Sequence, residues 1–450
     1  MITSLGGVEY FERQCLAFLK NPQIHHDQKE KIPGVFSYQE NKISFSFLVL
    51  GEIEEIHSLQ YQTLYIVDNK KRYTLYKLYD RIILGHTLGY SAPITLYYEW
   101  LFDDWIDPEK IMGDRFNCRT NYLESFFTTK KHLLPDDALF KVDESGCESY
   151  HENNDKDFIL QSFYIQNDFL SQRYEKDKIK AKSNLIPKRQ NRLLTYQFDL
   201  FLECNIIFET LEKLALIAEA IKNFFILIYA HSNFDIQIDY IQFKLSNKDI
   251  TAIKNTYKKD KKSMEIDLYG IAIQFKQIDH FSVMLEKWIV FYIKDNRDFQ
   301  LASILDIINK KDPIIHLYLD MFVLISMIES FLKKPQQTKL HEKLSEFFKI
   351  SLSRTKCDQT KNYFNDKCQE DLIQQIVDCR NSLAHGRSLK LDTNKATDIS
   401  HAFTDFKQIV IEFFFGEIGL SGFITNNFGF LNKVKLRNPP KTEKIAEPNR

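Results

Sequence analysis

The chain has 450 residues, of which 44% are hydrophobic and 27% charged, a globular composition with length for two or three domains. Its formal net charge of −1 excludes a global positive field, so a nucleic-acid site must be a local patch. The seven cysteines have no zinc-ligand spacing and an odd count, which excludes a disulfide framework and favours free thiols in a reducing cytoplasm.

Residues from about 33 to 140 are predicted to be rich in β-strands. Short alternating, β-branched or aromatic runs are typical of strands, and they occur at residues 43–47, 62–67, 73–78 and 94–98. Asp68 to Lys71 has the composition of a hairpin turn. We interpret the basic run 176–192 as a solvated loop. The first residues lack a signal-peptide pattern, and charged residues interrupt the apolar segment 206–230, so we expect no membrane span.

The middle of the chain mixes helix and strand signals. Apolar residues recur at spacings of three and four between 207 and 228, which predicts an amphipathic helix. Strands are predicted at 234–245 and 264–275, and a further helix at 281–294.

The last third is predicted to be helical. Asp312 and Pro313 favour a helix start before residues 314–332, and further helices are predicted at 339–350 and 371–385. A final helix starts near Asp392 or Thr393 and carries an apolar stripe made of Ile399, Phe403, Phe406, Val410 and Phe413.

These patterns predict an α+β fold in four parts. A β-rich N-terminal domain covers residues 1–195, and a mixed helix and strand middle segment covers 196–305. An all-α helical bundle covers 306–432, because four helices follow one another within a short stretch of chain. The tail 433–450 has few apolar residues and is predicted to be disordered.

One short motif carries recognisable chemistry: Arg380, Asn381 and His385, followed by Gly386, at the end of the helix predicted at 371–385. A guanidinium is a permanent cation shaped for phosphate, and an imidazole exchanges protons near neutral pH. Gly386 has the position of a glycine that ends a helix. Arg81 and His86 have the same spacing, but they lie in an apolar β-rich run, and we interpret them as structural.

Helical geometry constrains how these residues meet. Arg380 lies on a stripe with Ile373, Val377 and Ala384, where a guanidinium needs a partner. A separate column holds Asp378, Asn381 and His385, so Asn381 can orient the imidazole. Arg380 and His385 are about 140° apart on an ideal helix. They would converge if the last turn loosens at Gly386 or if two protomers place their motifs side by side, and we favour the second. The structural alternative is a capping histidine and an arginine salt-bridged to an acid.

Other candidate sites have weaker signals. The set His25, His26 and Asp27 has metal-ligand residue types but lies in a polar loop, which favours surface residues. Asp103, Asp104 and Asp107 would bind a cation or form an acidic turn, and we favour the turn. The basic runs 176–192 and 254–262 would either contact RNA or be solvated surface, and we favour solvated surface. We therefore expect neither a metal nor a cofactor.

The motif resembles the signature of the HEPN superfamily in its R-N-x-x-x-H form. The upstream sequence resembles the N-terminal domain of ApeA-type anti-phage proteins, in which a strand pair is followed by a short glycine and phenylalanine element. The matching residues here are Gly85, Thr87, Gly89, Thr95, Leu96, Gly113, Phe116, Leu123 and Glu124. Phe126 or Phe127 stands where that family has tryptophan. Residues 321–334 resemble the first helix of the ApeA-type HEPN domain, which often has a glutamate at the position of Glu329.

The resemblance implies a bacterial, cytoplasmic, metal-independent endoribonuclease that cleaves host RNA, with tRNA the expected target, in abortive infection. Arg380, Asn381 and His385 are the implied catalytic residues, with Glu329, Asp378 and Gly386 in support. Glu329 would pair with Arg380, or be an exposed acid. The implied partners are the RNA, a second copy of the chain and an unidentified phage trigger. The alternative is a HEPN-fold module that binds RNA or protein without cleavage.

Overall fold

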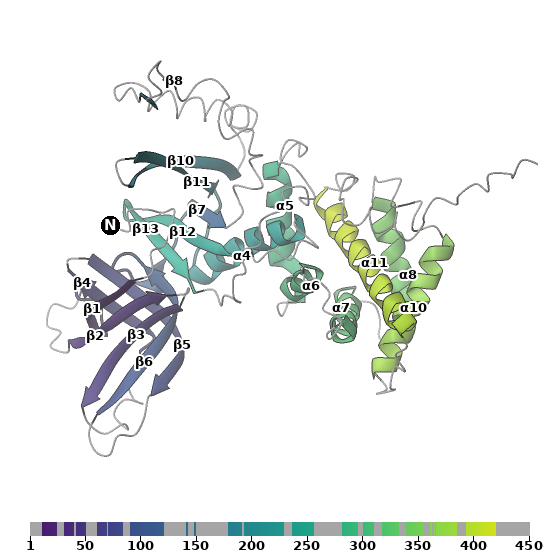
Figure 1. Cartoon of the computed structure of the whole chain (residues 1–450), viewed down its shortest axis with the longest axis horizontal. Coiled ribbons are helices and arrows are strands. Elements are labelled where there is room, and N and C mark those ends of the chain that lie inside the picture. The colour runs from purple at the N-terminus through teal and green to yellow at the C-terminus, as the bar shows by residue number, and fades with distance from the viewer. Residues whose placement is uncertain are drawn as a thin grey trace, which may run out of the picture. The chain divides into compact units, whose positions relative to one another are not determined.

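The computed structural model describes more than half of the chain. The described residues are 11–24, 31–39, 42–50, 61–69, 71–83, 91–120, 141–142, 148–149, 179–190, 193–228, 236–255, 281–295, 300–309, 317–332, 339–354, 361, 364, 366–384 and 393–419. The chain divides into two compact units, which we describe separately (Figure 1). The first comprises residues 1–124, 134–219 and 237–265, and the second comprises 125–133, 220–236 and 266–450.

Six antiparallel strands of the first unit close into a barrel. In chain order they are β1 (Phe11–Phe18), β2 (Ile32–Gln39), β3 (Lys42–Leu50), β4 (Thr63–Asp68), β5 (Lys71–Ile83) and β6 (Ser91–Phe102). Their spatial order is β6-β3-β2-β1-β4-β5, and a further pairing of β5 with β6 closes the ring. Asp68 pairs with Lys71 across the β4–β5 turn, and Asn69 has a φ of 42°, as the predicted hairpin requires.

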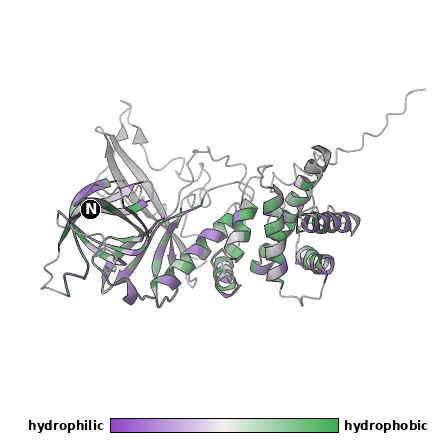
Figure 2. Ribbon diagram, turned by 90° about the horizontal axis from the view of Figure 1, so that it is seen from below, coloured by the Kyte–Doolittle hydropathy of each residue, from purple (hydrophilic) through white to green (hydrophobic). Residues whose placement is uncertain are grey.

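The barrel is filled by aromatic and branched side chains. Hydrophobic and hydrophilic residues alternate along its strands, as Figure 2 shows, and the apolar set faces inward. Fully buried members include Phe36, Phe45, Tyr98 and Leu64. The Tyr98 hydroxyl donates to the Tyr61 carbonyl over 3.0 Å, so this buried polar group is satisfied.

The same sheet continues beyond the barrel through five more strands. They are β7 (Phe116–Thr120), β10 (Ile179–Gln190), β11 (Leu193–Cys204), β12 (Ile238–Leu245) and β13 (Lys248–Lys254). Their order is β10-β11-β7-β12-β13, with β10 at the outer edge of the sheet and β13 next to β6 of the barrel (Figure 1). A separate pair joins β8 (Lys141–Val142) and β9 (Glu148–Ser149), and a 3-10 turn, η1, covers Pro108–Lys110. Gly113 bridges Phe208, and a Cβ at Gly113 would lie 2.6 Å from the Phe208 ring, so the glycine permits this close packing.

The predicted α+β fold class, with a mixed middle segment between a β-rich domain and a helical domain, is wrong. Residues 238–254 form β12 and β13, which lie between β7 and β6 inside the N-terminal sheet. The structure therefore has an N-terminal antiparallel barrel with an extended sheet, followed by helices that are mostly C-terminal. The backbone groups of β12 pair with β7, and those of β13 pair with β6. These pairings join residues that are far apart in the sequence, so local sequence patterns do not reveal them.

The basic run 176–192 is not the solvated loop that we predicted. It contains β10, which pairs along its whole length with the apolar strand β11. The strand β1 was also missed, because it lies before the region where alternation was recognised. The predicted strand at 264–275, the helix start at Asp312 and Pro313, and the tail 433–450 lie outside the described residues.

The second unit is helical in its described part. The helix α4 (Leu211–Ile228) spans the division between the units, and α5 (Phe281–Asp295) and α6 (Gln300–Asn309) follow. Four further helices pack on one another: α7 (Leu317–Phe331), α8 (Leu340–Arg354), α10 (Asp366–Ala384) and α11 (Thr393–Ile418) (Figure 1). Helices were predicted at all these places except α6. None of the described helices is long and apolar enough to cross a membrane.

The helix α11 is buried on every side over residues 402–415. It contacts α5, α7, α8 and α10, so burial extends beyond the predicted apolar stripe to all sides of the helix. Polar residues share this environment: Gln408 donates to Glu412 over 3.2 Å, and the Lys407 ammonium lies 4.5 Å from the centre of the Phe403 ring. The helix is the central element of the second unit.

Candidate functional site

The helix α10 positions Arg380 at the edge of a buried face. Leu372, Ile373, Ile376 and Cys379 are buried along the helix, and Arg380 follows them with a side chain that is 32% exposed. The predicted stripe through Ile373 and Arg380 therefore runs along the border of the core. At this border, an arginine can pack its methylene groups against the core while its charged group stays accessible to solvent.

Glu329 on α7 lies against Arg380, the pairing that the sequence left open. Glu329 Oε2 is 3.5 Å from Arg380 Nη2, and Glu329 Oε1 is 2.9 Å from the Nζ of Lys343 on α8. The exposed fractions of the side chains are 24% for Glu329 and 6% for Lys343. One carboxylate is thus shared by two cations from two other helices, and we call these three residues the charge triad.

The charge triad has an excess of one positive charge. Arg380 Nε is buried and has no hydrogen-bond partner among the described residues. A guanidinium carries five N–H donors, and the observed ion pair engages one end of it. The Arg380 side chain is 32% exposed, so an anion with several oxygen atoms, such as a phosphate, can reach the accessible part of the guanidinium beside this net positive charge.

The other residues of the motif are not gathered around Arg380. Asp378 is exposed and accepts a hydrogen bond from Gln374 Nε2 over 2.8 Å, and Asn381 is exposed as well. The described part of α10 ends at Ala384, so His385 and Gly386 lie outside the described residues. The structure thus brings Glu329 to Arg380, and Asp378 points to a different neighbour.

Lys343 is the residue of this site that sequence reasoning missed. It precedes the buried Phe347 by four positions and adjoins the buried Leu344, so it lies on the apolar face of α8. A charged residue on an apolar stripe was the reason to expect a partner for Arg380. The same criterion applied to α8 would have identified Lys343.

Comparison with known proteins gives no relative. The chain matches no family model, no curated protein and no solved structure. The case for a site therefore rests on the residues and on their geometry.

The acidic cluster after β6 is a structural turn. Asp107 caps η1 by accepting from the backbone N–H of Glu109, Asp104 pairs with Lys248, and Asp103 accepts from the Thr251 N–H over 2.7 Å. Burial raises the pKa of Asp103, against the effect of that hydrogen bond. Within the described ranges, no three His, Cys, Asp or Glu side chains are grouped to hold a metal ion. The set His25, His26 and Asp27 falls outside those ranges.

Two further sequence features have structural roles where they are described. Arg81 lies in β5, paired with Leu96, while His86 lies outside the described residues. Lys254, the first residue of the second basic run, forms an ion pair with Glu99 and lies over the Trp100 ring. Residues 256–262 are not described.

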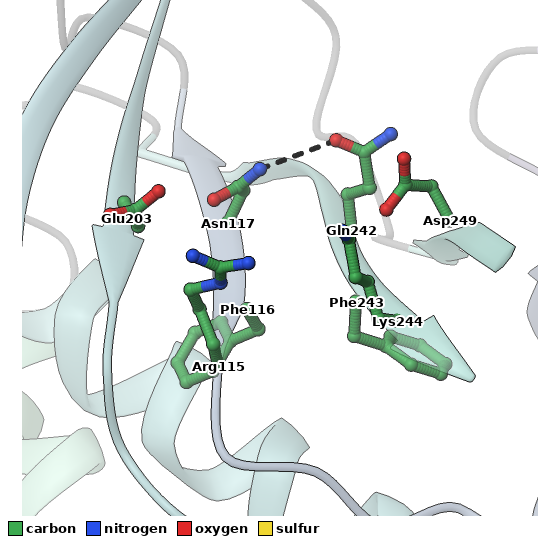
Figure 3. A pocket seen from close by; sticks show the side chains of 8 residues that line it. All are labelled: Arg115, Phe116, Asn117, Glu203, Gln242, Phe243, Lys244 and Asp249. Atoms are coloured by element: carbon green, nitrogen blue, oxygen red, sulfur yellow. Dashed lines mark hydrogen bonds between the residues drawn. The ribbon is translucent and has the colours of Figure 1, made fainter. Parts of the chain in front are cut away.

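A polar pocket of about 200 Å³ lies on the extended sheet of the first unit (Figure 3). Asn117 on β7 pairs in register with Glu203 on β11 and with Gln242 on β12, and Asn117 Nδ2 donates to Gln242 Oε1 over 3.3 Å. The charges around the pocket balance, with Arg115 and Lys244 against Glu203 and Asp249, so they favour no class of ligand. The remaining lining residues are Phe116 and Phe243.

Proposed function

We propose that this protein is a metal-independent endoribonuclease of the HEPN type that cleaves host RNA, with tRNA as its target, during abortive infection of a bacterium by phage. The protein acts in the cytoplasm as a homodimer. The helical unit carries the nuclease site, and the β-rich unit responds to a phage trigger. The alternative, an RNA-binding or protein-binding module without activity, is an outcome of the test below.

The charge triad is the observation that supports this proposal. It holds the arginine of the R-N-x-x-x-H motif at the edge of a helical core, with about a third of its side chain accessible, no partner for Nε among the described residues, and a net positive charge. An arginine with a purely structural role would be expected to have its donors satisfied in its own core. An arginine that binds a phosphate is expected to have N–H donors that are not engaged within the protein.

The proposed reaction uses the nucleophile that RNA itself carries. His385 takes the proton of the ribose 2′-OH, and the 2′-oxygen attacks the adjacent phosphorus. Arg380 stabilises the charge that develops on the non-bridging oxygens. The bond to the 5′-oxygen breaks, that oxygen receives a proton from the His385 of the second protomer, and a 2′,3′-cyclic phosphate remains. Asn381 orients the imidazole.

Expression in a bacterial host tests the proposal. We expect growth arrest, or protection against phage, that is lost in Arg380→Ala and in His385→Ala at unchanged protein levels. Arg354→Ala is the matched control, because Arg354 is a partly exposed arginine of α8 that pairs with Glu417. The control is expected to behave as wild type.

Purified protein decides between cleavage and binding. Bulk tRNA incubated with the full chain is expected to yield 2′,3′-cyclic phosphate ends, with the same rate in EDTA. DNA cleavage, or cleavage abolished by EDTA, would contradict the mechanism. RNA that is bound without being cut, with a phenotype retained in both motif variants, would support the binding module instead.

A further inference from the structure

The two cations of the charge triad differ in burial and in their distance from Glu329. The Lys343 side chain is 6% exposed, and its ammonium lies 2.9 Å from Glu329. The Arg380 side chain is 32% exposed, and its contact with Glu329 is longer, at 3.5 Å. The buried cation is therefore in close contact with the carboxylate, whereas the accessible cation lies farther from it.

We infer that Lys343 is a positioning residue that keeps Glu329 paired while Arg380 turns to a phosphate of the RNA. The inference rests on the proposed function, because it requires Arg380 to bind the substrate. It adds a role for a residue outside the R-N-x-x-x-H motif.

Two anions compete for one guanidinium. The Glu329 carboxylate and an RNA phosphate both bind Arg380 through charge-assisted hydrogen bonds. When Arg380 leaves, Glu329, with three quarters of its side chain buried, would lose its counterion unless another cation remained. Lys343 fills this role, since its buried ammonium stays at Glu329 whatever Arg380 does. Arg380 then moves without leaving a bare carboxylate behind.

This role predicts a specific kinetic signature for Lys343→Met. Without Lys343, Glu329 holds Arg380 more tightly and is left unpaired when RNA binds. The free-energy cost of the unpaired Glu329 is the same in the bound ground state and in the transition state. The substitution therefore raises KM and leaves kcat unchanged. The loss of one charge-assisted partner corresponds to a rise in KM of roughly tenfold, with kcat changed by less than about threefold. Lys343→Arg keeps a cation on the carboxylate and restores KM.

The experiment measures kcat and apparent KM of the full chain on bulk tRNA for wild type, Lys343→Met and Lys343→Arg. Lys349→Met is the matched control, because Lys349 is an exposed lysine of the same helix. The pair Glu329→Gln and Glu329→Gln/Lys343→Met completes a double-mutant cycle. With no carboxylate to hold, Lys343→Met is expected to leave KM unchanged in the Glu329→Gln background. If Lys343→Met fails to fold, Lys343→Gln tests the same loss of charge with a donor retained.

The outcomes separate the two proposals. A KM effect that appears with Lys343→Met, is rescued by arginine and vanishes in the Glu329→Gln background supports the inference. A wild type that cuts RNA, with KM unmoved by Lys343→Met or with the same shift in the Glu329→Gln background, overturns the inference alone. A wild type that cuts no cellular RNA overturns the proposed function, and the inference with it.

Discussion

Substitutions in the charge triad should have unequal effects on stability. Lys343 is almost buried, and Glu329 is its ionic partner among the described residues. Glu329→Ala leaves that ammonium buried and unpaired, whereas Arg380→Gln leaves Glu329 with Lys343 still bound at 2.9 Å. The acidic partner is therefore expected to matter far more to folding than the arginine.

The burial of each partner sets the magnitude. Removing one member of a buried ion pair costs about 3 kcal/mol at the lower end of measured cases, and we apply this value to Glu329→Ala. For a helical unit of this size, that loss lowers the midpoint of thermal unfolding by roughly 6–12 °C. The Arg380 pair is longer and partly exposed, so Arg380→Gln should cost less than about 1 kcal/mol.

Thermal unfolding of the full chain, followed by far-UV circular dichroism, measures this difference. The double variant Glu329→Ala/Lys343→Met is the control, because removing both partners leaves no buried charge and should recover part of the loss. Equal losses for Glu329→Ala and Arg380→Gln, or a double variant that is less stable than Glu329→Ala, would refute the reasoning. The expected result also means that an inactive Arg380 variant is inactive for chemical reasons.

Three further predictions concern the cores of the two units. A Cβ at Gly34 would lie 2.5 Å from the backbone oxygen of Ser46, so Gly34→Ala should destabilise the barrel by about 2 kcal/mol, and an unchanged unfolding midpoint would contradict this packing. Burial raises the pKa of Cys118 to about 12 from its ordinary value of 9.0, so the unfolded chain loses this proton first, and this thiol should lower the free energy of unfolding by roughly 1 kcal/mol between pH 8 and pH 10. Urea unfolding at the two pH values measures the fall, which Cys118→Ala should reduce. Trp288→Phe removes a buried 2.8 Å hydrogen bond to the Ala220 carbonyl and should cost about 1–3 kcal/mol in chemical unfolding; a loss below about 0.5 kcal/mol would indicate that another donor replaces it.

Local patterns predicted the elements whose burial is one-sided or continuous. The alternation over 43–47 lies within β3, and the apolar spacing before residue 228 lies within α4. Such periodicities follow directly from which face of an element meets the core. They placed α5, α7, α8, α10 and α11 to within a few residues.

The errors arose where long-range pairing overrides local composition. The charges of β10 indicated a loop, but its backbone pairs with β11 from Leu193 to Cys204. The return of β12 and β13 to the N-terminal sheet has no local signal either, and it overturned the predicted middle segment. At the candidate site, the stripe containing Arg380 predicted the need for a partner, but the bridging position of Glu329 between two helices required the three-dimensional structure.

The return of residues 237–265 to the first unit has a practical consequence for dissecting the molecule. A truncation before β12 would strip β7 and β6 of neighbours and expose unpaired strand edges, which promote aggregation. During ribosomal synthesis, the first unit is complete only after the segment 220–236 of the second has emerged. Isolating either half for study therefore calls for a fusion that rejoins discontinuous pieces, because no single cut separates them.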